Sequence, residues 1–234
     1  MIKNMFYAIF LFVSSTCANA VIVDGNFSAL VYYDGSDEGV WSRDLSGVEV
    51  TGKFWYDTAL APVADASYPY STYYRSETNS WLNLTYFIDG KTIDVSRRAG
   101  NSSDFDEAVE VVDINADTNY FAIHDEVLQG DYQGDFVLTS GSLSIRDTAD
   151  VITHNGLEQN FPWVGDGSYD DRASLIMFGS NKGEFFTSLL EMYLTDLTVA
   201  TRAVSVPAPS PFPLLLIGLA ALILRRRADK KSCT

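Results

Sequence analysis

The sequence predicts an all-β fold, namely an antiparallel two-sheet sandwich of the jelly-roll type. Apolar and polar residues alternate with a period of two in many segments, as they do in half-buried strands. The pair Asp89-Gly90 separates two such segments, and Asp-Gly is a strong signal for a tight hairpin. The sequence has no strand–helix–strand alternation of the kind that indicates a parallel sheet. The fold is therefore expected to be built from hairpins.

The expected strands follow one another along the chain. Residues 47–57 place Val48, Val50 and Phe54 on one side of a strand, and residues 81–95 hold two strands joined by the Asp-Gly turn. The last segment has a helical pattern up to Tyr193, but its threonines and Val199 favour a strand. Further strands are expected in residues 108–114, 119–127, 134–147, 172–179 and 188–202.

Both ends of the chain carry signals of export. Residues 1–20 begin with a lysine, continue with an apolar core and end in the small residues of an A-x-A cleavage site, so we expect a secretory signal peptide. The Sec translocon and signal peptidase would then process it. Near the C-terminus, residues 212–224 form an apolar run of 13 residues. Since a spanning helix needs about 20 residues, this run predicts a short transmembrane helix.

A basic tail, residues 225–234, follows the apolar run and is expected to stay in the cytoplasm. Residues 21–203 would form one exported all-β domain, because about 185 residues suit a single large domain. Residues 204–211 form a proline-rich linker that contains a Pro-x-Pro motif. The proline motif, the short apolar helix and the arginine cluster occur in that order.

This ending, "VPAPSPFPLLLIGLAALILRRR", resembles the PEP-CTERM sorting signal of Gram-negative, biofilm-forming bacteria. One residue departs from the family, since alanine replaces the usual acidic residue between the prolines. The resemblance implies that an exosortase removes the tail during export. The protein would then reside in the inner membrane only transiently and reach the cell surface or the medium. The residues concerned are Val206, Pro207, Ala208 and Pro209 in the motif, Phe212, Leu214, Leu215, Leu216, Ile217 and Leu224 in the helix, and Arg225, Arg226 and Arg227 in the tail.

The body of the chain resembles a group of uncharacterised exported bacterial β-proteins. The likeness rests on a Gly-x-Phe-x-Tyr-Asp-Thr strand at residues 52–58 and on later strands that end in turns. Many of these proteins end in sorting tails, and none supplies an activity that could be transferred to residues here. This resemblance supports the fold and leaves the function open.

The charge of the chain excludes some partners. The net charge is −15, and leaving out residues 1–20 and 204–234 leaves 10 basic and 30 acidic residues, a net charge of −20. Nucleic-acid phosphates repel such a surface, so a nucleic-acid partner is not expected. Divalent cations and neutral polymers are more compatible with this negative charge as partners. The two cysteines, Cys17 and Cys233, lie in the ends, so no disulfide is expected in the domain.

The sequence argues against catalysis. The body has two histidines and no cysteine, which disfavours metal-dependent or Cys-His chemistry, and it lacks a Gly-x-Ser-x-Gly motif. We therefore expect a cell-surface or extracellular-matrix protein that is not an enzyme and associates with exopolysaccharide in a biofilm. The alternative is a secreted carbohydrate-active enzyme or lectin of the jelly-roll type. Two carboxylates about 5–10 Å apart in a cleft would favour the enzyme.

One segment suggests a Ca²⁺ site, and no other cofactor is indicated. Four oxygen-bearing residues occur at alternate positions, the spacing of a Ca²⁺ loop: Asp113, Asn115, Asp117 and Asn119. The EF-hand pattern then fails, because Thr118 stands at the turn glycine and His124 at the closing glutamate. A polar turn between strands is the alternative.

A second segment suggests a carbohydrate site. Its flat aromatic side chains lie near polar groups, as sugar-binding surfaces require, and the residues proposed are Tyr70, Tyr73, Tyr74 and Trp81. The alternative is that these aromatics cover one end of the hydrophobic core.

Overall fold

The structure is a computed structural model that describes residues 20–68, 71–76, 81–95, 105–114, 118–130, 136–147, 151–166 and 170–204. Within them, Val21–Ala203 form one compact unit. The predicted signal peptide, sorting motif, apolar helix and basic tail lie outside the described residues. Among the residues that are described, no helix is both long and apolar enough to cross a membrane.

The described residues contain strands and loops but no helix, which confirms the all-β antiparallel prediction. The final strand is extended throughout, as its threonines and Val199 indicated. Twelve strands are present in this part of the chain: β1 (Ala20–Asp34), β2 (Glu49–Asp57), β3 (Asp65–Tyr68), β4 (Ser71–Ser76), β5 (Leu82–Ile88), β6 (Lys91–Asp94), β7 (Phe105–Ile114), β8 (Thr118–Gly130), β9 (Phe136–Asp147), β10 (Phe161–Val164), β11 (Arg172–Asn181) and β12 (Glu184–Val204).

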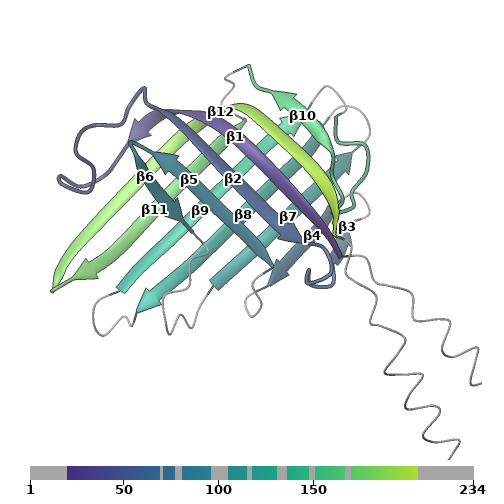
Figure 1. Cartoon of the computed structure of the whole chain (residues 1–234), viewed down its shortest axis with the longest axis horizontal. Coiled ribbons are helices and arrows are strands. Elements are labelled where there is room, and N and C mark those ends of the chain that lie inside the picture. Colours follow the sequence, from purple (N-terminus) through teal and green to yellow (C-terminus); the bar gives the residue numbers. More distant parts are fainter. Residues whose placement is uncertain are drawn as a thin grey trace, which may run out of the picture. The chain divides into compact units, whose positions relative to one another are not determined.

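These strands belong to one curled sheet rather than to two separate sheets. Its order is β3-β4-β7-β8-β9-β11-β12-β1-β2-β5-β6, and β10 joins β12 separately. Figure 1 shows β1, β2, β5 and β6, here called the front group, crossing β7, β8, β9 and β11. These four strands and β4 are called the rear group. The prediction of two separate sheets is therefore corrected: the front and rear groups belong to one continuous ladder, in which β12 and β1 connect them.

The curl is visible in the burial pattern of β12. Leu194 and Leu197 are both buried, and the two residues between them, Thr195 and Asp196, are both exposed. A regular strand alternates sides at every residue, so this slip of one position is typical of a β-bulge, which bends a strand and increases its twist. The bend lets one half of β12 pair with β11 and the other half with β10.

The inner faces of the two groups meet in an aromatic core. The rings of Phe54 in the front group and Phe121 in the rear group have centroids 6.2 Å apart. The hydroxyl of Tyr86 crosses the core, and its one proton is shared between the carbonyl oxygens of Ser142 (2.9 Å) and Ser174 (2.8 Å). A single core therefore lies between the halves of the sheet.

Two glycines make room for two of the core rings. Across the β1–β2 pair, Gly25 lies opposite Phe54 and Phe27 lies opposite Gly52. A Cβ atom on Gly25 would lie 2.0 Å from the Phe54 ring, and one on Gly52 would lie 2.1 Å from the Phe27 ring. Each phenylalanine therefore covers the glycine on the neighbouring strand, and a larger residue at either glycine would collide with a ring.

The predicted Asp-Gly hairpin is confirmed. Asp89 and Gly90 have φ values of 48° and 76°, and they join β5 to β6, with Ile88 paired to Lys91. Positive φ at both central residues is the geometry that matches a two-residue hairpin to the twist of its strands.

Two loops cover the ends of the curled sheet. Residues 35–48 insert Trp41 and Leu45 into the core, and the Trp41 Nε1–H donates to Ser188 Oγ (2.9 Å). Residues 151–160 insert Ile152 and Leu157, and the Leu157 carbonyl accepts a hydrogen bond from the Tyr56 hydroxyl (2.6 Å). The core is thereby sealed without helices in the described part of the chain.

The edge of β5 is closed by carboxylates. Glu107 Oε2 accepts hydrogen bonds from the backbone N–H groups of Trp81 (2.7 Å) and Leu82 (3.0 Å), and Asp125 Oδ2 accepts one from Leu84 (3.1 Å). Glu107 and Asp125 lie opposite each other on β7 and β8, and both are buried. Buried N–H groups need partners, so these two side chains of the rear group take the place of a neighbouring strand.

Candidate functional site

A groove lies on the outer face of the front group. Its volume is about 500 Å³, and strands β1, β2, β5 and β6 supply its lining. The outward side chains along it are Asp24, Asn26, Lys53, Trp55, Asn83, Thr85, Phe87, Thr92 and Asp94. We call this feature the outer groove.

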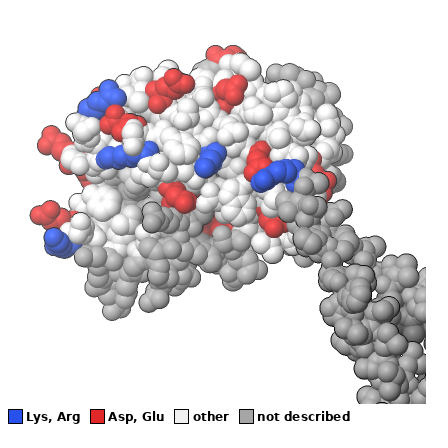
Figure 2. Space-filling view, viewed as in Figure 1, with Lys and Arg blue, Asp and Glu red and all other residues white. Residues whose placement is uncertain are grey.

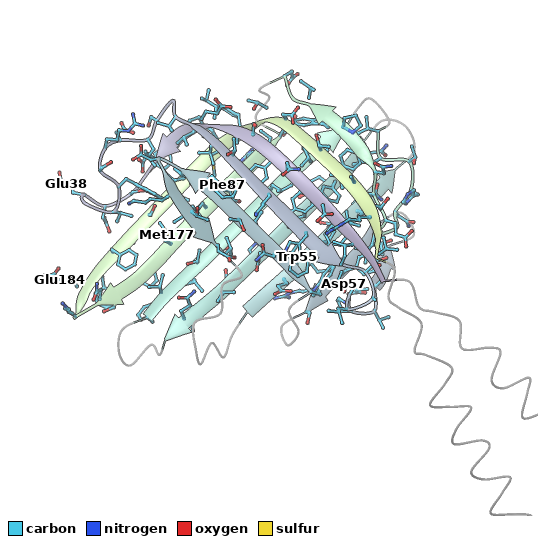
Figure 3. All side chains as sticks on the ribbon, in the orientation of Figure 1. Glu38, Trp55, Asp57, Phe87, Met177 and Glu184 are labelled. Atoms are coloured by element: carbon cyan, nitrogen blue, oxygen red, sulfur yellow. The ribbon has the colours of Figure 1, made fainter. Side chains whose placement is uncertain are left out.

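Two aromatic side chains of the outer groove face solvent. Along β2 the even-numbered residues are buried and the odd-numbered residues exposed, so Trp55 points outward with 39% of its surface exposed. On the neighbouring strand, Phe87 is 38% exposed. Figure 3 labels both residues and shows them on adjacent front strands, at different heights along those strands. They form two flat apolar platforms on one face.

Polar groups around the two platforms are held in place by neighbours. Asn83 Nδ2–H donates to Asp94 Oδ1 (3.0 Å), and the Thr85 hydroxyl donates to Asn83 Oδ1 (3.2 Å). Asp24 forms a salt bridge with Arg202, with Nε and Oδ2 separated by 3.0 Å. The outer groove thus offers donors and acceptors with fixed directions beside its aromatic faces.

Lys53 lies between the platforms. Its Nζ atom lies 5.7 Å from the centroid of the Phe87 ring. None of the salt bridges found among the described residues involves Lys53, whereas Arg202 on β12 is paired with Asp24. Figure 2, drawn from the same side, shows charged groups scattered over a mainly uncharged surface. The ammonium group of Lys53 is therefore a donor that a ligand in the groove can reach.

A smaller groove lies on the outer face of the rear group. It has a volume of about 220 Å³ and a floor of alanine and serine, and Tyr73, Tyr120, Glu110 and His124 line it as larger side chains. Burial raises the pKa of Tyr120 above its ordinary value, and burial is also the main cause of the raised pKa of Tyr73. Both phenols therefore stay protonated and uncharged at neutral pH.

The structure separates the three described aromatics of the four predicted to bind carbohydrate. Tyr73 lines the rear groove, but Tyr74 points to the other side of β4 and packs against the core. Trp81 is fully buried, with its ring centroid 5.9 Å from that of Tyr56, so the prediction that it offers a face to sugar is corrected. Tyr70 lies outside the described residues.

Two of the four residues predicted to bind Ca²⁺ are described, and they lie on β7 and β8. Asp113 is paired with Asn119 across these two strands, and Asn115 and Asp117 lie outside the described residues. The Asn119 side chain is fully buried, and its Nδ2–H donates to the carbonyl oxygen of Ile152 (2.8 Å). Asn119 thus faces the core and helps to hold the 151–160 loop. The described residues include no cluster of three or more His, Cys, Asp or Glu side chains arranged to hold a metal.

Two pairs of carboxylates can be compared with the geometry of glycoside hydrolysis. Glu107 and Asp125 are neighbours, but both are buried and bound to backbone N–H groups. Asp24 and Asp94 both line the outer groove, on β1 and β6, which are three strand spacings apart in the sheet. Three spacings of about 4.8 Å give about 14 Å, more than the roughly 5–10 Å that separates catalytic carboxylates.

The outer groove was not predicted from the sequence. A signal was present, since the period of two in residues 49–57 assigns Trp55 to the polar side of the strand, where a tryptophan is unusual. Phe87 follows the same rule on the next strand. No protein-family model, no curated protein and no solved structure matches the chain.

Proposed function

We propose that this protein is an exported, non-catalytic protein that binds polysaccharide of the cell surface or extracellular matrix through the outer groove. The observation that carries the proposal is the pair of exposed aromatic faces, Trp55 and Phe87, beside oriented amide, hydroxyl and carboxylate groups. The apolar C–H face of a sugar ring packs on a flat aromatic ring, and its hydroxyls need donors and acceptors at the rim. The outer groove supplies both.

Binding rather than hydrolysis is favoured by the arrangement of the carboxylates. Asp24 is neutralised by Arg202, Asp94 accepts a hydrogen bond from Asn83, and the two acids lie far apart on the sheet. A hydrolase needs an acid and a second carboxylate on either side of one glycosidic bond. A jelly-roll enzyme would therefore need a different site.

The charge of the protein favours an uncharged polysaccharide as the ligand. The net charge of −20 between residues 21 and 203 repels a polyanion at long range. A neutral polysaccharide experiences no such repulsion, and the outer groove contacts it mainly through aromatic faces and uncharged polar groups.

The proposed location depends on the C-terminal sequence. The Pro207-Ala208-Pro209 motif, the 13-residue apolar run and the three arginines support processing by an exosortase. In this proposal the apolar run holds the precursor in the inner membrane until the tail is removed. The domain is then released to the surface or the medium, where it meets exopolysaccharide.

One preparation tests both parts of the proposal. Protein recovered from the medium and envelope of the producing cells should have an intact mass that lacks everything after a position between residues 206 and 210. In native gels cast with the extracellular polysaccharide of the same cells, this protein should migrate more slowly than in plain gels. Trp55→Ala should abolish the retardation, and Tyr73→Ala in the rear groove should leave it unchanged.

Other results would contradict the proposal. A full-length mass in the inner membrane of cells with an active exosortase would show that the tail is a plain anchor. Equal migration with and without polysaccharide would refute binding, and loss of retardation in Tyr73→Ala alone would move the site to the rear groove.

A further inference from the structure

The register of β2 and β5 fixes the spacing of the two aromatic platforms. Trp55 lies opposite Asn83, and Phe87 lies opposite Thr51, so the platforms are four residues apart along the strands and one strand apart across them. With about 3.3 Å per residue and about 4.8 Å between strands, their Cα atoms are roughly 14 Å apart. This separation exceeds the width of a single sugar ring.

The surface between the platforms is polar rather than apolar. The intervening row contains Lys53 and Thr85, which are paired across the two strands, and Asn26 extends it onto β1. Lys53 Nζ lies on the Phe87 side of this row, 5.7 Å from the ring centroid. Thr85 is buried, whereas Lys53 and Asn26 are exposed. A ligand that touches both aromatics must therefore cross a strip in which Lys53 and Asn26 offer hydrogen bonds and no ring offers stacking.

From this spacing we infer that the outer groove binds a linear glycan segment of at least three sugar units, which runs obliquely across β2 and β5. One unit stacks on Trp55, another stacks on Phe87, and the units between them take hydrogen bonds from Lys53 and its neighbours. The inference rests on the proposed polysaccharide binding and adds a length requirement to it. A monosaccharide or disaccharide reaches one platform only.

A chain-length series tests the requirement. The extracellular polysaccharide of the producing cells is partly hydrolysed, and fractions of one to six sugar units are titrated by calorimetry into the full-length protein in detergent. The association constant should rise at least tenfold between two units and the first fraction that spans both platforms, and then level off.

Two alanine variants test whether the rise in the association constant depends on both platforms. Trp55→Ala and Phe87→Ala should each lower the affinity for the six-unit fraction to that of the two-unit fraction. Tyr33→Ala is the matched control, because Tyr33 is an exposed aromatic on β1 (48%) that does not line the groove, and it should bind like the parent.

The outcomes distinguish a failure of the two-platform inference from a failure of the proposed polysaccharide binding. An affinity that is the same for one unit as for six, or that only one of the two alanine variants lowers, would overturn the two-platform inference and leave polysaccharide binding intact. If neither the fractions nor the intact polysaccharide bind, the proposed function itself is wrong.

Discussion

The front and rear groups of the sheet use the same kinds of residue in opposite places. The rear group turns two carboxylates inward, where Glu107 and Asp125 bind backbone N–H groups of the front group. The front group turns its acids outward, where Asp24 and Asp94 border the outer groove. Its large aromatics lie on both sides, with Phe54 buried and Trp55 exposed.

The difference shows that burial and partners, rather than residue type, decide what an acidic or aromatic side chain does. A buried carboxylate that accepts hydrogen bonds from two N–H groups stabilises the junction of the two groups, because its loss would leave both N–H groups buried without an acceptor. An outward carboxylate with an arginine or amide partner contributes little to stability and can be used for recognition. Stability should therefore be most sensitive inside the rear group, and binding most sensitive outside the front group.

The largest effect on stability is expected for Glu107→Ala. The change leaves the N–H groups of Trp81 and Leu82 buried without their acceptor, at about 1–3 kcal/mol each, so the free energy of unfolding should fall by about 2–6 kcal/mol. Equilibrium urea denaturation measures it. Glu126→Ala, on the outward side of the same strand pair, is the control and should change stability by less than about 0.5 kcal/mol. Equal effects of the two variants would remove the distinction between inward and outward acids.

A smaller loss of stability is expected for Gly25→Ala in the front group. The new Cβ would collide with the Phe54 ring, and overpacking of this kind costs about 1–3 kcal/mol. The midpoint of thermal unfolding should fall, whereas Ser28→Ala, on the outward side of the same strand, should leave it nearly unchanged. An unchanged midpoint in Gly25→Ala would show that the front group tolerates a side chain where the structure has none.

The smallest effect is expected at high pH, and it tests whether the Tyr86 phenol is buried in the core between the two groups. Burial raises the pKa of Tyr86, and the nearby Asp125 raises it further, so the folded pKa exceeds the unfolded value of about 10. Stability from this group is therefore complete below about pH 10 and is lost above it, at about 1.4 kcal/mol per pH unit. Tyr86→Phe should reduce the slope of unfolding free energy against pH by that amount. Tyr86→Phe also removes the hydrogen bond of the phenol, but that loss does not depend on pH in this range and leaves the slope unchanged. An identical slope in both proteins would contradict the burial of the phenol.

Several strands were predictable because their patterns are local. Residues 49–57 alternate cleanly, and Asp89-Gly90 has the residues that a two-residue turn requires, so both were expected and both are present. The extended form of β12 followed from its threonines and Val199. Local preference and the fold agree in these segments.

Other strands were missed because their signals depend on distant partners. Strand β1 contains Asp24-Gly25, a pair typical of turns, and the glycine is used instead to admit the Phe54 ring of the next strand. Strand β10 has four residues and includes Pro162, which lacks a backbone donor. Glu107 and Asp125 look like ordinary surface acids until the opposite group places the edge of β5 against them.

The sequence alone determined the secondary-structure class, the Asp89-Gly90 hairpin and the buried side of regularly alternating strands such as β2, because these depend on neighbours within a few positions. The predictions of an export signal and a sorting tail likewise rest on contiguous residues alone. Only the tertiary structure decided that the two layers are one curled sheet, that Trp81 is buried while Trp55 is open, and that Trp55 and Phe87 share a groove. Those properties arise when strands distant in sequence pair in register and one face is left uncovered, and no local pattern contains that information.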